Sequence, residues 1–149
     1  KAESRGLGDV YKRQQYYMKL LAERLGYRFV AVTSLSADVY AQRLRTCNLN
    51  KLFGDGTFVD YHYLPCGADK DDILEELSHK YYGSIWVEDK YVNAEAGAKV
   101  GFDALLIEHG HNLNYEGDCK VVRNWEEIYN YVERKETERD LERRTRKFN

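Results

Sequence analysis

Two adjacent carboxylates follow an apolar run in the middle of the chain. The run at residues 84–87 leads directly into Glu88 and Asp89, and Asn93 follows four residues after Asp89. Paired carboxylates at a strand end are hard oxygen ligands, which Mg²⁺ accepts together with waters and a substrate phosphate. Because the two charges repel each other and raise a carboxyl pKa, a cation or a lysine is expected nearby. The segment predicts a Mg²⁺ site formed by Glu88, Asp89 and Asn93. The alternative is a solvated strand end at a helix N-terminus that favours acids.

Further polar side chains stand at comparable places along the chain. Thr33 is the last residue of the apolar run at residues 29–33, and Ser34 follows it. Lys70 stands near the start of an amphipathic helical pattern. A hydroxyl after a strand can hold a phosphoryl oxygen, or it can cap the next helix. A lysine at a helix start can neutralise phosphoryl charge, or it can simply be solvated.

The elements that must position these residues alternate between strands and helices. Strands are predicted at residues 29–33, 57–63, 84–87 and 104–107. Helices are predicted at residues 15–25, 37–45, 69–80 and 125–132, and Ser36 is the predicted N-cap of the second. A further helix is predicted after the acidic pair; it runs through Gly97 and Gly101 terminates it. Such alternation implies βαβ units and a mainly parallel sheet. Ligands bind at the carboxyl ends of such strands, which directs attention to Thr33, Ser34, Glu88, Asp89 and the loop at residues 109–112.

These motifs resemble those of the haloacid-dehalogenase superfamily. Its fourth motif is an acidic pair followed by Asp or Asn, a small-residue helix and Gly, as in residues 84–102; its second motif matches Thr33, and its third matches Lys70. The resemblance implies an α/β fold, a Rossmann-like three-layer core with a parallel sheet. It implies a Mg²⁺-dependent phosphomonoester hydrolase in which Thr33 and Ser34 hold phosphoryl oxygens and Lys70 neutralises the developing charge.

The first motif of that superfamily has no match in the chain. It should be a strand followed by Asp-x-Asp-Gly-Thr, whose first Asp is the nucleophile and whose second is a general acid/base. In the nearest segment, residues 53–57, Phe53 takes the place of the nucleophile, and the Asp55-Gly pair predicts a turn. Asp69 and Asp71 also have the Asp-x-Asp spacing, but they stand at the start of a predicted helix and do not match the motif. We therefore expect the C-terminal part of a hydrolase whose first strand is missing, and we expect this chain to be inactive.

The two ends of the sequence differ from its middle. Residues 1–14 show no helical or strand period and resemble translated sequencing-adapter sequence, which predicts a non-native or disordered arm. Residues 15–133 form the predicted partial core. Residues 134–149 are almost all charged and predict a helical or frayed tail.

Composition restricts the class of protein. The chain of 149 residues is 43% hydrophobic and 32% charged with one Pro, which is typical of a globular domain. A net charge of −2 gives no field that would recruit nucleic acid or an anionic membrane. There is no signal-peptide pattern, and no apolar run approaches the roughly 20 residues of a membrane span. The three cysteines lack a CxxC spacing and predict reduced thiols in a cytoplasmic protein.

Several functional alternatives remain open. The loop at residues 109–112, followed by an apolar helical pattern from Val121, is similar to nucleotidase-like members of the superfamily, so a nucleotide or another small phosphorylated substrate is expected. The Lys70-Asp-Asp start suggests a polynucleotide 3′-phosphatase instead. A non-catalytic α/β module could use the acidic pair for Mg²⁺ or a partner. His109 and His111, with a thiolate from Cys66 or Cys119, could offer Zn²⁺ ligands, although the spacing matches no structural zinc pattern.

Overall fold

The computed structural model describes residues 2–35 and 38–148, which form two compact units. The first unit comprises residues 1–65 and 125–149, and the second comprises residues 66–124. The predicted core at residues 15–133 is thus divided, and the charged C-terminal segment belongs to the same unit as the N-terminal segment. None of the described helices combines the length and apolar character of a membrane span.

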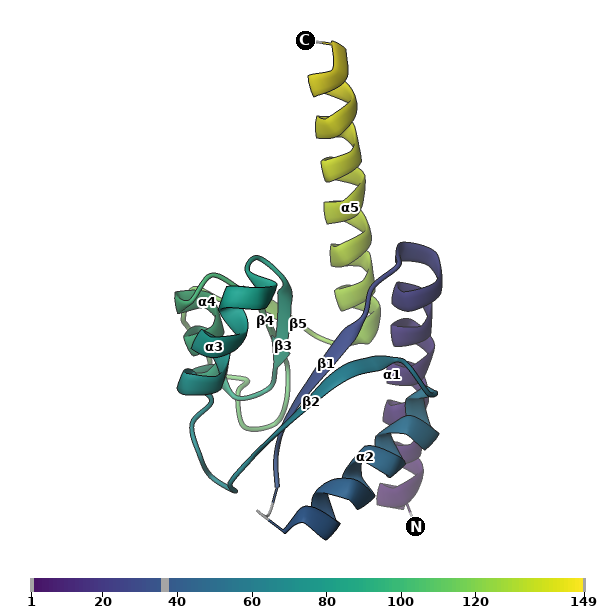
Figure 1. Ribbon diagram of the computed structural model, residues 1–149, viewed down its shortest axis with the longest axis vertical. Coiled ribbons are helices and arrows are strands. Elements are labelled where there is room, and N and C mark those ends of the chain that lie inside the picture. The colour runs from purple at the N-terminus through teal and green to yellow at the C-terminus, as the bar shows by residue number, and fades with distance from the viewer. Residues whose placement is uncertain (1, 36–37, 149) are drawn as a thin grey trace. The chain divides into compact units, whose positions relative to one another are not determined.

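The first unit contains a βαβ motif and two long helices (Figure 1). Its elements are α1 (Ala2–Leu25), β1 (Phe29–Ser34), α2 (Val39–Phe53), β2 (Phe58–Leu64) and α5 (Trp125–Phe148). The two strands pair in parallel, with Thr33 opposite Tyr63. Helix α1 packs against α5 and also contacts α2. Parallel strands need a long crossover connection, and α2 supplies it between β1 and β2.

The core of the first unit lies where α1 meets α5. Met18 and Leu21 of α1 and Ile128 and Val132 of α5 are at most 3% exposed. Their i, i+3 and i, i+4 spacings place them on one face of each helix. Gly26, with a φ of 75°, ends α1 in a conformation that glycine adopts without strain.

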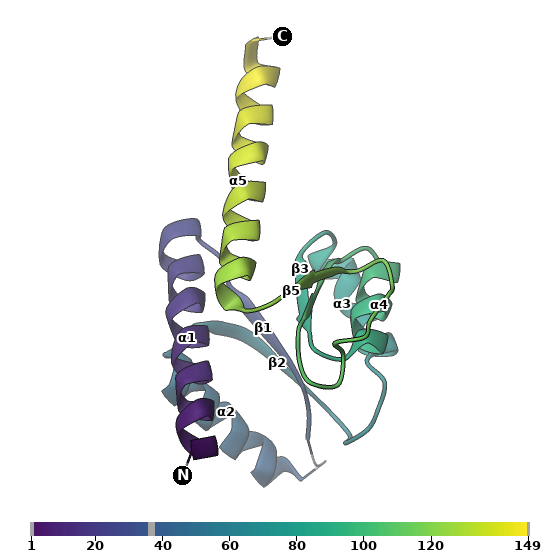
Figure 2. The same cartoon turned by 180° about the vertical axis from the view of Figure 1, so that it is seen from behind.

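The second unit is a three-stranded parallel sheet with two helices. Its elements are α3 (Asp71–Tyr81), β3 (Ile85–Glu88), α4 (Tyr91–Lys99), β4 (Asp103–Ile107) and β5 (Lys120–Val122), and the strand order is β3-β4-β5. Figure 1 and Figure 2 both show α3 and α4 side by side on one side of this sheet. Leu74 of α3, Leu105 and Leu106 of β4 and Val122 of β5 are at most 2% exposed. The carboxyl ends of β3 and β4 therefore lie on a rigid apolar base.

A close approach joins α4 to β3. The indole Nε1 of Trp86 donates to the carbonyl oxygen of Asn93 at 3.1 Å. A Cβ added at Gly97 would lie 2.4 Å from Cδ1 of Trp86, so only a residue without a side chain fits. The small-residue helix that the sequence pattern predicted is needed here for packing against the strand.

The structure differs from the predicted elements at residues 2–14 and 120–122. Helix α1 includes residues 2–14, which were expected to lack regular structure; their non-native origin stays a prediction. The predicted N-cap Ser36 lies outside the described residues, and Asp38 caps α2 by accepting from the Tyr40 backbone N–H at 3.0 Å. Residues 120–122, where the apolar helix was expected to begin, form β5. Residues 134–148 continue α5, which agrees with the helical form of the predicted tail.

Candidate functional site

Lys70, Glu88 and Asn93 form a buried polar cluster at the carboxyl end of β3. The Lys70 Nζ donates to Oε2 of Glu88 at 2.9 Å, and the two side chains are 13% and 6% exposed. The Lys70 backbone N–H donates to Oδ1 of Asn93 at 3.2 Å. Asn93 is 3% exposed. The structure thus brings together three predicted site residues from β3, α4 and the start of α3.

The Glu88 carboxylate is held at both oxygens. Its Oε1 accepts from the backbone N–H groups of Asp89 and Lys90, each at 3.2 Å. Burial raises the pKa of Glu88, and the hydrogen bond and charge of Lys70 lower that pKa without reversing the shift. The Lys70 Nζ also lies 5.4 Å from the centroid of the Trp86 ring, a cation–π distance. Glu88 and Asn93 therefore fix the position of Lys70.

Asp89 is the accessible member of the acidic pair. Its side chain is 48% exposed, and its Oδ2 lies 3.4 Å from Nε2 of His111. Partial burial raises the pKa of Asp89, but hydrogen bonds with Glu88 and His111 outweigh it and hold the pKa below the usual value. The pair is thus divided into a buried carboxyl that favours its proton and an exposed carboxylate that favours its charge. This separation is typical of functional sites.

The loop after β4 lies beside Asp89, as the sequence predicted. Asn112, which is 6% exposed, ties this loop to the end of β3. Its Nδ2 donates to the carbonyl oxygens of Asp89 at 2.5 Å and Ile107 at 2.8 Å, while its Oδ1 accepts from the His109 backbone N–H at 2.8 Å. These bonds hold His109 and His111 near Asp89. The clamping role of Asn112 was not predicted, because it depends on contacts between distant residues.

Thr33 and Ser34 end β1 in the first unit. Oγ1 of Thr33 accepts from Nη1 of Arg45 at 3.4 Å, and Ser34 is exposed. Arg45 was not among the predicted site residues. The sequence signal that could have identified it is a basic residue in the helix that follows the strand. Since Lys70 and Asp89 belong to the other unit, their proximity to Thr33 stays a prediction.

The segment around Asp55 forms the turn that the sequence predicted. Gly54 and Gly56 have φ angles of 93° and 82°, and the Thr57 backbone N–H donates to the Gly54 carbonyl oxygen at 3.3 Å. Phe53 packs its ring 5.7 Å from the ring of Phe58. The turn thus carries no strand-end nucleophile.

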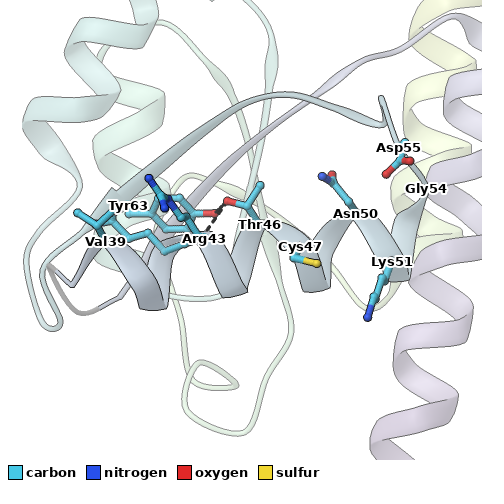
Figure 3. A pocket seen from close by; sticks show the side chains of 10 residues that line it. Val39, Arg43, Thr46, Cys47, Asn50, Lys51, Gly54, Asp55 and Tyr63 are labelled. Atoms are coloured by element: carbon cyan, nitrogen blue, oxygen red, sulfur yellow. Dashed lines mark hydrogen bonds between the residues drawn. The ribbon is translucent and has the colours of Figure 1, made fainter.

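A cavity of about 780 Å³ lies along α2 in the first unit (Figure 3). Its lining residues are Val39, Gln42, Arg43, Thr46, Cys47, Asn50, Lys51, Gly54, Asp55 and Tyr63. The Thr46 hydroxyl contacts the Tyr63 hydroxyl within this wall. None of the predicted site residues lines the cavity.

Comparison with known proteins identifies the fold. No protein-family model matches the sequence, and no curated protein matches it. The structure resembles the crystal structure of D,D-heptose 1.7-bisphosphate phosphatase from B. bronchiseptica, complexed with magnesium and phosphate. The TM-score is 0.66 at 12% sequence identity, and the match covers 83% of each chain. The fold is of the haloacid-dehalogenase-like, Rossmann type. At this identity the likeness concerns the fold alone.

Proposed function

We propose that the chain is the C-terminal part of a Mg²⁺-dependent phosphomonoester hydrolase. The observation that carries the proposal is the contact of Lys70 with Glu88 beside the exposed, ionised Asp89, at a strand end in a haloacid-dehalogenase-like fold. Lysine and carboxylates at this edge of a parallel sheet suit a phosphate ester and its metal ion. That the structural neighbour was crystallised with magnesium and phosphate supports the same chemistry here.

The donor set of the site fits Mg²⁺ most directly through Asp89. Its carboxylate is half-exposed and ionised, as a hard-cation ligand must be. Glu88 and Asn93 complete the predicted ligand set, and in this structure their side-chain oxygens accept from Lys70, Asp89 and Lys90. Mg²⁺ bound there would neutralise phosphoryl charge. Lys70 would neutralise charge on the phosphoryl group directly, and Thr33 and Ser34 would hold its oxygens.

The chain as written is proposed to be inactive. Covalent phosphoryl transfer in this superfamily needs a nucleophilic Asp, and no Asp-x-Asp pair stands directly at the end of a strand among the described residues. β1 and β3 each have one hydrogen-bonded neighbour among the described strands, so each sheet can accept a further strand. An upstream strand that carries the nucleophile is the proposed missing part.

The proposed substrate is a small phosphate ester such as a nucleotide. The support is the tied loop at residues 109–112, which lies beside Asp89 as the nucleotidase-like resemblance implied. The proposed location is cytoplasmic, because three cysteines without a CxxC spacing are typical of reduced thiols.

Turnover of phosphate esters tests the proposal. The chain as written should not hydrolyse p-nitrophenyl phosphate or nucleoside monophosphates with or without Mg²⁺, whereas a version with the upstream reading frame restored should hydrolyse at least one of them with Mg²⁺. Lack of activity in the restored version would favour a binding module. Turnover by the present chain that Asp89→Asn abolishes would contradict the missing nucleophile.

A further inference from the structure

Asp89, His109 and His111 bring three ligand atoms together on the surface of the second unit. One carboxylate oxygen and one nitrogen from each imidazole all lie within 4.8 Å of one another. Around a tetrahedral Zn²⁺ with bonds of about 2.0–2.1 Å, ligand atoms stand roughly 3.4 Å apart. The Asp89–His111 distance is already 3.4 Å. Small rotations of exposed side chains are enough to complete such a shell.

The chemistry of this group differs from that of the proposed Mg²⁺ site. Mg²⁺ selects oxygen ligands, whereas two imidazoles with one carboxylate suit Zn²⁺, Co²⁺ and Ni²⁺. Three protein ligands leave a coordination position for water, as in catalytic rather than structural zinc sites. All three side chains are exposed, so a metal ion can reach them from solvent.

The group is held together by contacts that do not involve its ligand atoms. Asn112 donates to the carbonyl oxygen of Asp89 and accepts from the backbone N–H of His109, and its own backbone N–H donates to the His109 carbonyl oxygen at 2.9 Å. These bonds fix the backbone at two ligand positions. Fixed ligands lose little conformational freedom on binding, which raises affinity.

We propose that Asp89, His109 and His111 form a binding site for a borderline divalent transition-metal ion such as Zn²⁺. The site uses the carboxylate partner in place of the cysteine thiolate considered from the sequence. It shares Asp89 with the proposed Mg²⁺ site, and occupancy by Zn²⁺ would therefore compete with Mg²⁺ at that carboxylate. The inference itself rests on the geometry of the three side chains and not on the proposed hydrolase activity.

Metal titration of the present chain tests the site. Thiols can also bind Zn²⁺, so the titrations use the full chain with Cys47, Cys66 and Cys119 replaced by Ser. Zn²⁺ binding is measured by calorimetry and Co²⁺ binding by visible absorption, after removal of metal with a chelator. We expect saturable binding of one ion per chain. His109→Ala with His111→Ala should weaken it by more than about 100-fold, since even the loss of a supporting contact costs about 10–100-fold.

The other two histidines of the chain supply the matched control. His62→Ala with His79→Ala removes the same number of imidazoles, including one that lies 2.9 Å from Asp60, and should leave affinity unchanged. Circular dichroism checks that each variant is folded. Undiminished binding by the His109/His111 variant, equal loss in the control, or absence of saturable binding would each overturn the site. The metal titration does not depend on turnover, so each of these results is independent of the test of the proposed hydrolase activity.

Discussion

The ammonium group of Lys70 lies 2.9 Å from a carboxylate oxygen of Glu88, and both side chains are largely buried. Removing two charges from water costs several kcal/mol for each ion, and a short contact between them offsets this only in part. The raised pKa of Glu88 shows which effect is larger here, because burial outweighs the lysine. The folded chain holds the Glu88 proton more tightly than the unfolded chain does.

Lys70→Met should make stability strongly dependent on pH. The unfolded chain loses the Glu88 proton near the ordinary value of 4.5, while the folded chain keeps it to higher pH. The contribution of Glu88 to stability is therefore fully present below that value and is lost as pH rises through the folded-state pKa. Without Lys70 the folded pKa rises further. Relative to the parent chain, we expect little loss at pH 4 and a loss on the order of 3 kcal/mol at pH 8, from urea unfolding.

Glu88→Gln provides the control for this prediction. Combined with Lys70→Met, it removes the titrating carboxyl, so the extra pH dependence should disappear. Met retains an unbranched apolar stem beside Trp86, which limits the loss of packing. A stability loss equal at pH 4 and pH 8 would mean that Lys70 acts through packing alone.

The sequence predicted the neighbourhood of this site better than its contacts. The rule that ligands gather at strand ends predicted the places of Glu88 and Asp89, and charge repulsion predicted a nearby cation or lysine. The sequence could not predict that Asn93 accepts a hydrogen bond from the backbone N–H of Lys70, because that bond joins positions 23 residues apart.

The elements that were missed had weak local signals. Residues 120–122 form β5, yet three residues are too few to show a strand period, and a helical pattern begins at Trp125. At the other end, residues 2–14 show no helical period, and Gly6 and Gly8 disfavour a helix there. At residues 120–122 the pairing with β4 decided what local preference left open.

Gly97→Ala should destabilise the second unit. Alanine favours a helix over glycine by about 1 kcal/mol. The added Cβ would lie 2.4 Å from the Trp86 ring, and overpacking costs about 1–3 kcal/mol, so we expect a net loss of up to about 2 kcal/mol. Gly110→Ala is the control, since no atom lies within 4 Å of its added Cβ. Thermal unfolding of both variants checks the difference, and equal midpoints would contradict the close packing.

Two truncations should separate the packed part of α5 from its exposed end. Ending the chain at Arg139 removes the exposed residues 140–147, including Leu141 at 57%, and the two positions that follow them, and should change stability by less than about 1 kcal/mol. Ending it at Glu133 also removes Glu136, whose Oε1 accepts from the Tyr27 hydroxyl at 2.6 Å. That bond to a charged group should add a loss of about 1.5 kcal/mol.

Tyr27→Phe in the full chain tests the source of that second loss. It removes the same hydrogen bond and retains the helix, so its effect should match the difference between the two truncations in urea unfolding. A large loss from ending the chain at Arg139 would show instead that the distal part of α5 stabilises the fold.

Asp89→Asn and Lys70→Ala should respond differently to Mg²⁺ in a version with the upstream segment restored. Asp89 is proposed to contribute charge to the metal, so its loss weakens Mg²⁺ binding and leaves phosphoryl charge less neutralised. We expect kcat to fall by about 10² to 10³, as for single electrostatic contributors. Higher Mg²⁺ should recover part of this loss, because part of it is metal affinity. Lys70→Ala should also lower kcat, but higher Mg²⁺ should restore little.

The measurement is kcat/KM across a Mg²⁺ titration for both variants, with circular dichroism to confirm folding. Asp89 is half-exposed and Lys70 is buried against Glu88, so Asp89→Asn should leave stability nearly unchanged while Lys70→Ala lowers it. Activity loss without stability loss at Asp89 then separates a metal role from a packing role. Normal activity of Asp89→Asn at low Mg²⁺ would contradict the metal assignment, because a ligand of the required cation cannot be replaced by an amide without a loss of affinity.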